Sequence, residues 1–178
     1  MFFDTQINWD ARWINWDLVA PSAIVDGTDC PILEPINASW STKRNFCSHK
    51  FGSAALRYVV AVHCDSGDFV WVSKAYPGAT AETEIVRKEL EAALVDGEKL
   101  LADRLFSSGP YITALPYDCE RTRRVNSVRS KVERKISEIK NFSIFRQSYR
   151  STDYLVHENI FHLICRFINI INKNKIKI

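Results

Sequence analysis

The sequence lacks the features that mark membrane-spanning, secreted and disulfide-stabilised proteins. Its most apolar stretch, residues 154–171, is interrupted by His157, Glu158 and Arg166, and we therefore expect a buried helix there instead of a transmembrane span. The five cysteines are odd in number and have no CxxC spacing, and the N-terminus has no basic segment followed by an apolar run. These absences argue against a disulfide framework and predict a protein of a reducing compartment that is not secreted.

No linker divides the chain, and we find one short repeat. Ile-Asn-Trp-Asp at residues 7–10 returns at residues 14–17, and Trp9, Trp13 and Trp16 share one helical face, which predicts a short helix over the edge of the core. With 178 residues, 46% of them hydrophobic and 25% charged, the chain fits one globular domain. We expect this domain at residues 20–170, after a short helical segment at 1–19 and before a frayed basic tail at 171–178.

Short strand-like runs give way to helical spacing along the chain. We interpret residues 22–25 and 99–102 as buried strands that end at Asp26 and Asp103, the first closed by a turn at Gly27. Residues 56–64 and 69–72 have the pattern of a hairpin, residues 80–95 that of a helix, and residues 111–115 that of a strand, whereas the chain after Arg121 is helical in character. This order predicts an α/β fold, in which helices pack on a mixed sheet.

Charge is divided unevenly between the two parts of the chain. Residues 1–120 hold ten Lys and Arg against seventeen Asp and Glu, whereas residues 121–178 hold fourteen against four. Such a division suits metal ions in one part of a site and phosphate groups in another. Enzymes that never touch nucleic acid show milder versions of it, so the charge pattern alone does not decide the partner.

Three acids stand where a metal site could form. Asp26 and Asp103 follow predicted strands, and Glu133 lies on the helix stripe marked by Val128 and Val132. Carboxylates that meet at one point repel one another unless cations are bound, and hard ions such as Mg²⁺ or Mn²⁺ prefer carboxylate oxygen. Two such ions about 4 Å apart support displacement at a phosphodiester. The competing interpretation is that these are ordinary surface acids, which are common at strand ends.

The segments around these acids resemble, in the same order, those of the DDE-superfamily endonucleases, a group that includes the PIF/Harbinger and related insertion-sequence transposases. The resemblance covers roughly residues 20–170 and concerns the catalytic core only. Each piece is short, and their ordered succession carries the resemblance. The matching segments are Asp26-Gly27-Thr28, Ser48–Phe51, Leu56–Val60, Gly67, Trp71–Ser73, Tyr76–Thr80, Ile85–Arg87, Gly97–Asp103, Pro110–Ile112, Asn126, Arg129, Val132-Glu133 and Ile139–Phe142.

The resemblance implies a ribonuclease H-like fold, with Asp26, Asp103 and Glu133 as catalytic acids that bind Mg²⁺ or Mn²⁺. It implies cleavage and transfer of DNA strands at transposon ends, and hence a nuclear location in a eukaryotic host and a cytoplasmic one otherwise. Duplex DNA, at transposon ends and at target sites, is the implied partner; a separate DNA-binding protein and a second copy of the chain are further candidates. The alternative is a domesticated, catalytically silent module that binds DNA or chromatin.

Four basic residues are candidates for DNA contact. From Arg121 to Lys140 there are eight basic residues and two acids, and within this stretch we assign DNA binding to Arg129, Lys140, Arg124 and Lys131. Arg129 shares a helix face with Glu133, so it could contact the scissile phosphate, orient Glu133, or form an ordinary i, i+4 ion pair with it. A solvated helix face is the competing account of the whole stretch.

Other polar residues have weaker patterns. Cys47, His49, His63 and Cys64 do not match a common zinc spacing, and alternation along a strand would point the last two to opposite faces. For His49 and Lys50, the sequence favours a packing or surface role over a place in the site.

Overall fold

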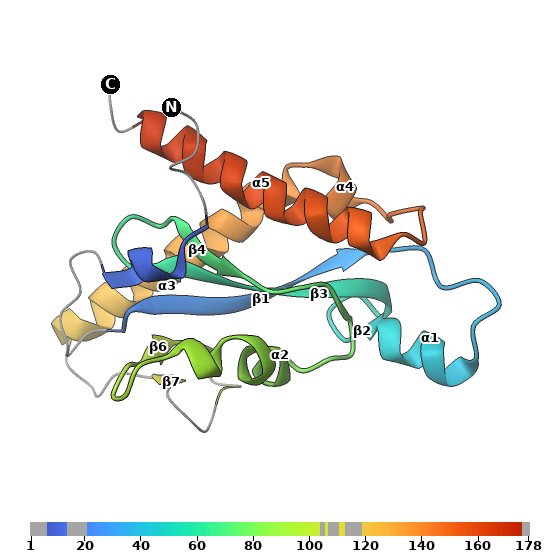
Figure 1. Cartoon of the computed structure of the whole chain (residues 1–178), viewed down its shortest axis with the longest axis horizontal. Helices are drawn as coiled ribbons and strands as arrows, with labels where there is room; N and C mark the ends of the chain where they lie inside the picture. Colours follow the sequence, from blue (N-terminus) through green and yellow to red (C-terminus); the bar gives the residue numbers. More distant parts are fainter. Residues whose placement is uncertain (1–6, 14–20, 104–105, 107–110, 113–118, 176–178) are drawn as a thin grey trace.

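The computed structural model describes residues 7–13, 21–103, 106, 111–112 and 119–175, with the backbone alone at 111–112, 119–128 and 175. The strands and a few short helices make up the first part of the chain, and the helices α3, α4 and α5 follow (Figure 1). The elements are η1 (Trp9–Trp13), β1 (Ala23–Pro31), α1 (Trp40–Phe46), β2 (Cys47–Ser48), β3 (Ser53–His63), β4 (Phe69–Val72), β5 (Tyr76–Pro77), α2 (Glu82–Glu89), η2 (Glu91–Ala93), β6 (Leu100–Leu101), β7 (Tyr111–Ile112), α3 (Cys119–Lys140), α4 (Ser143–Arg146) and α5 (Tyr154–Lys175).

The strands form one mixed sheet in the order β2-β3-β1-β6-β7, and β4 and β5 also pair with β3. The central pair is antiparallel along the whole of β1, from Ala23 opposite His63 to Pro31 opposite Ala55. On its other side β1 runs parallel to β6, where Ile24 lies beside Leu101. The mixed sheet and its flanking helices confirm the predicted α/β class and the ribonuclease H-like architecture. The predicted hairpin is confirmed as β3 and β4.

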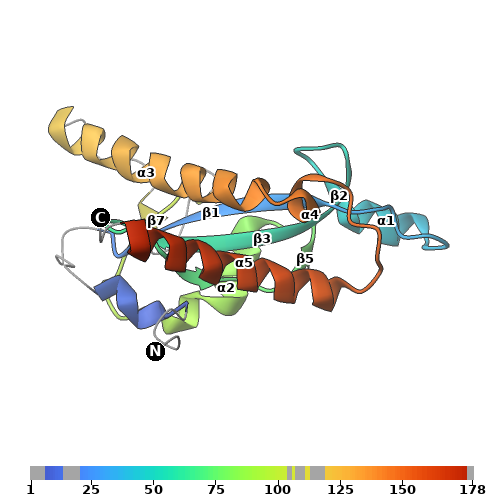
Figure 2. The same cartoon turned by 90° about the horizontal axis from the view of Figure 1, so that it is seen from above.

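Side chains of β1 alternate between two apolar layers. Ile24 and Cys30 pack with residues of α3, α4 and α5, whereas Ala23 and Val25 pack with α2 and η1. Figure 2 shows α3 and α5 on the same side of the sheet. Because the alternation has a period of two, Asp26 belongs to the face that α3 covers. Asp29 belongs to the face of α2.

Strand β1 is longer than the sequence suggested, and the prediction that it ends at Asp26 with a turn at Gly27 is wrong. Gly27 pairs with Val59 in the middle of the strand, and pairing continues through Asp29 opposite Arg57. The polar residues are tolerated because Asp29, 1% exposed, is neutralised by a bidentate ion pair with Arg57, with N–O distances of 2.7 and 2.8 Å. Hydrophobicity therefore marked only the first part of this strand.

Other boundaries also differ from the sequence-based ones. The predicted helix at residues 80–95 is α2, which ends at Glu89 and is followed by the short turn η2. The predicted N-terminal helix is the 3₁₀ helix η1 as far as Trp13, and residues 14–17 lie outside the described residues. The predicted frayed tail is helical as far as Lys175, and residues 176–178 lie outside the described part of the chain.

Helix α5 protects the sheet edge formed by β4. The Asn169 side chain accepts a hydrogen bond from the Phe69 N–H and donates one to the Phe69 carbonyl, both at 2.9 Å. Glu158 accepts from the Ala75 N–H at 2.7 Å, further along the same edge. These side chains satisfy backbone groups that an exposed edge would offer to another strand. In the described ranges, neither α5 nor any other helix is long and apolar enough to span a membrane.

Candidate active site

Three elements converge on a pocket of about 240 Å³ beside the middle of β1. Asp26 enters it from β1, on the face that α3 covers. Asp103 follows β6 by two residues, and the parallel pairing of β6 with β1 brings it to the same place. Glu133 follows Val132, which is buried against the sheet and so sets the helix face that Glu133 borders. The lining residues are Ile24, Val25, Asp26, Lys50, Ala102, Asp103, Arg129, Val132 and Glu133.

The surroundings of Asp26 shift the pKa of its carboxyl group. Burial raises the pKa of Asp26 above its ordinary value, and the nearby carboxylates of Asp103 and Glu133 raise it further. A hydrogen bond from the Gly27 N–H to Asp26 Oδ1, at 2.8 Å, and the charge of Lys50 act in the opposite direction. Burial therefore disfavours the ionised form of Asp26, its acidic neighbours add a smaller repulsion, and a bound cation would relieve that repulsion.

Asp103 is held by Arg129 across the pocket. Arg129 Nη2 lies 3.0 Å from Asp103 Oδ1, and the two side chains are 34% and 51% exposed. Arg129 therefore forms its ion pair with Asp103, across the pocket. The sequence analysis had considered an i, i+4 pair of Arg129 with Glu133 instead. A pair this exposed contributes about 1 kcal/mol or less, so a stronger ligand can displace it.

The donor set fits a hard divalent ion, although the side chains are not gathered into a ready ligand set. Three carboxylates supply oxygen only, the donor type that Mg²⁺ and Mn²⁺ prefer. Within the described residues, no three Asp, Glu, His or Cys side chains lie together closely enough to form a metal site. Asp103 is engaged by Arg129, so sharing one ion requires this exposed carboxylate to turn from its partner.

Lys50 also lines the pocket, and its side chain is 54% exposed, so it lies at the surface, as the sequence favoured, and at the edge of the site as well. Its ammonium donates a hydrogen bond to the Gly27 carbonyl at 3.1 Å and lies 3.9 Å from Glu82 Oε1. Glu82 is a second residue that the sequence analysis did not assign. The signal was Gly27, because a glycine inside a strand often marks a close approach by another group. A Cβ at Gly27 would overlap the Glu82 side chain, with Cγ at 2.7 Å.

A comparison with models of known protein families identifies the family of the chain. A family model described as DDE superfamily endonuclease matches residues 25–169, most of the sequence. The chain belongs to the DDE superfamily endonucleases. No curated protein and no solved structure matches it.

In this DDE endonuclease, two of the predicted DNA-contact residues donate hydrogen bonds to backbone carbonyls of the protein itself. The Lys131 ammonium donates to the carbonyls of Cys64 and Asp65, at 2.6 and 2.8 Å. The Lys140 ammonium donates to the Asp29 carbonyl and, at 3.3 Å, to the Phe145 carbonyl. The Arg124 side chain lies outside the described residues. Of the four residues, Arg129 lines the pocket of the acids, and DNA contact stays a prediction for all of them.

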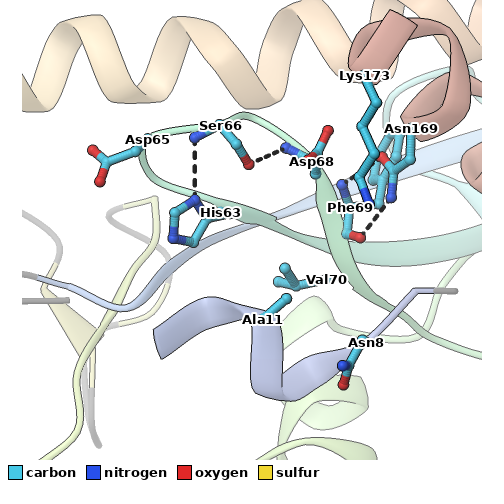
Figure 3. Close-up of a pocket in the computed structure, with 10 residues that line it drawn as sticks. All are labelled: Asn8, Ala11, His63, Asp65, Ser66, Asp68, Phe69, Val70, Asn169 and Lys173. Atoms are coloured by element: carbon cyan, nitrogen blue, oxygen red, sulfur yellow. Dashed lines mark hydrogen bonds between the residues drawn. The ribbon is translucent and has the colours of Figure 1, made fainter. Parts of the chain in front are cut away.

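A larger hollow, about 400 Å³, lies at the turn between β3 and β4 and contains none of the three predicted catalytic acids (Figure 3). The His63 Nδ1 accepts a hydrogen bond from the Ser66 N–H at 3.1 Å, which shapes this turn. The neighbouring Cys64 thiol points elsewhere and donates to the Pro21 carbonyl at 3.3 Å. The two residues therefore face different surroundings. The pocket that unites the acids, although smaller, is the candidate active site of the endonuclease.

Proposed function

We propose that this endonuclease cuts and joins DNA strands at transposon ends in a metal-dependent reaction, with Asp26, Asp103 and Glu133 as the metal-binding catalytic acids. The observation that carries the proposal is that these acids, from three separate elements, line one pocket. Mg²⁺ or Mn²⁺ bound by them would supply activation of an attacking water or 3′-hydroxyl and stabilisation of the leaving oxygen.

The chain's own residues have distinct tasks in this proposal. Asp26 is held in the sheet by pairing with Val60 of β3, and β6 pairs with the same strand two residues earlier, at Ile24. Arg129 can leave the exposed Asp103 carboxylate for a phosphate oxygen, which a guanidinium binds through paired N–H groups. The substrate of the proposed enzyme is duplex DNA. The enzyme would act on it in the nucleus of a eukaryotic host, or in the cytoplasm of any other host.

The second candidate is a catalytically silent module that binds DNA or chromatin through the same domain. It is favoured by the ion pair between Arg129 and Asp103, since a carboxylate that keeps this partner would not bind a metal ion. The two candidates differ in whether a divalent ion displaces Arg129.

Nicking of supercoiled plasmid with Mg²⁺ or Mn²⁺ tests the proposal. We expect Asp26→Asn, Asp103→Asn and Glu133→Gln each to reduce the nicking rate at least about 100-fold, and the exposed control Asp96→Asn to match the wild type. Calorimetric titration with Mn²⁺ gives a readout apart from activity, and Asp26→Asn should weaken that binding. Equal nicking by the wild type and the three variants would contradict the assignment. DNA binding without nicking or metal binding would favour the silent module.

A further inference from the structure

Lys50 stands on a different wall of the pocket from Arg129. Arg129 comes from α3, whereas Lys50 comes from the turn between β2 and β3. The Lys50 side chain is 54% exposed, so its ammonium is accessible from solvent while it stays bound to the Gly27 carbonyl. An ammonium has three N–H donors, and the described contacts of Lys50 engage it with one carbonyl at hydrogen-bond distance.

A buried hydrogen-bond network through Ser48 holds the turn that carries Lys50. Ser48, fully buried, donates its hydroxyl proton to Asp29 Oδ2 at 2.5 Å. The same hydroxyl oxygen accepts hydrogen bonds from the Lys50 N–H, at 3.1 Å, and the Phe51 N–H, at 3.3 Å. Because Asp29 is itself fixed by Arg57, the backbone of the turn is anchored to the sheet. The position of Lys50 is therefore built into the fold.

Glu82 lies near the ammonium end of the Lys50 side chain. It lies across Gly27, is 13% exposed, and has its carboxylate 3.9 Å from the Lys50 ammonium. Burial raises the pKa of Glu82, and the charge of Lys50 acts against this rise. The ammonium thus stays between Glu82, the Gly27 carbonyl and the pocket of the acids.

We propose that Lys50 binds a non-bridging oxygen of the DNA phosphodiester seated in this pocket, with Glu82 and the Gly27 carbonyl as the groups that position it. The inference rests on the proposed function in that the ligand is DNA. A phosphate brought beside three carboxylates meets like charges, and a compact ammonium on the pocket wall offsets this repulsion. Lys50 and Arg129, from separate elements, then contact the phosphate from two directions.

Equilibrium binding of a fluorescent duplex oligonucleotide, in EDTA and over a series of salt concentrations, tests the inference without requiring a metal. We expect Lys50→Met to weaken binding about tenfold at low salt and to lower the slope of log Kd against log salt by about one charge. Lys50→Arg should restore most of the affinity. The matched control is Lys88→Met, because Lys88 is 56% exposed, pairs with Glu84 and lies outside the pocket.

A structural role for Lys50 would change the melting temperature and leave the salt slope as it is, so both are measured. Affinity and slope equal to those of the wild type in Lys50→Met, or an equal loss in Lys88→Met, would overturn the inference. Nicking assays separate this outcome from failure of the proposed function. If neither the wild type nor Asp26→Asn nicks DNA, the proposed nuclease activity is refuted. In that case, a loss of DNA affinity in Lys50→Met that Lys88→Met does not show still supports the phosphate contact. If the wild type nicks, Lys50→Met should raise KM more than it lowers kcat.

Discussion

Replacing Arg57 by methionine should be among the most destabilising single changes in this protein. The Asp29 side chain is fully buried, and the Arg57 side chain is 8% exposed. Arg57 donates two hydrogen bonds to the carboxylate, at 2.7 and 2.8 Å, and a third to the Thr80 carbonyl at 2.8 Å. Methionine replaces the aliphatic part of the side chain but has no donor groups, so it leaves the buried carboxylate with the Ser48 hydroxyl as its remaining described donor.

The expected cost follows from leaving a charge buried without its partner. Removal of one member of a buried ion pair costs about 3–5 kcal/mol, against a total stability of about 5–15 kcal/mol for a domain. Asp29→Asn should cost a similar amount because it leaves the guanidinium unpaired. The double variant should lose clearly less than the sum of the two single losses, since neither charge is then left without its partner.

Urea unfolding followed by tryptophan fluorescence and by circular dichroism measures these free energies. The control is Lys43→Met, which breaks an exposed ion pair with Glu34, and we expect it to change stability by less than about 1 kcal/mol. Losses below about 1 kcal/mol in Arg57→Met, or additive losses in the double variant, would refute the reasoning.

The pH dependence adds a second test of the Asp29 pair. Burial would raise the pKa of Asp29, but hydrogen bonds from Arg57 and Ser48 outweigh it and hold the pKa below 3.8. A depressed pKa contributes stability that is present above the unfolded value and is lost as the pH falls through the folded one. Arg57→Met should therefore remove this acid-dependent contribution, and acid titrations of the two proteins should diverge above pH 3.8 and converge below it.

Three further predictions follow from the other contacts. Gly27→Ala should impair folding and nicking because the new Cβ overlaps the Glu82 side chain. Adding Glu82→Ala should restore folding, which melting curves measure. If folding is not restored, the overlap with Glu82 is not the cause of the loss. Tyr58→Phe should cost about 1–3 kcal/mol in urea unfolding, because it removes the 2.6 Å hydrogen bond to buried His157, while Tyr149→Phe should cost less. Burial lowers the pKa of His157 to about 4, so stability should fall as the pH drops from 6.5 towards 4; a flat acid titration in that window would contradict its burial as a neutral group.

Local sequence patterns predicted many of the strands and helices of the fold. The Val- and Ala-rich run at residues 56–64 and the turn after it predicted the hairpin, and helical spacing predicted α3 and α5, because these signals repeat within a few residues. Strand β1 was only half recognised, since Asp26 and Asp29 interrupt its apolar character. The short helix α1 and the strands β2 and β5 were not predicted at all, as their lengths leave little periodicity to detect.

For the site, the sequence by itself determined that Asp26 and Asp103 come after apolar strand residues and that Glu133 lies on a helix, and its ordered segments indicated the family. Only the tertiary structure decided that Asp26 faces α3 while Asp29, three residues later, is buried against Arg57. It also decided that Arg129 pairs with Asp103 and that Lys50 reaches the pocket. The physical reason is that periodicity records which face a residue occupies within one element. The partner across that face comes from a segment far along the chain, and sheet register and helix packing choose it.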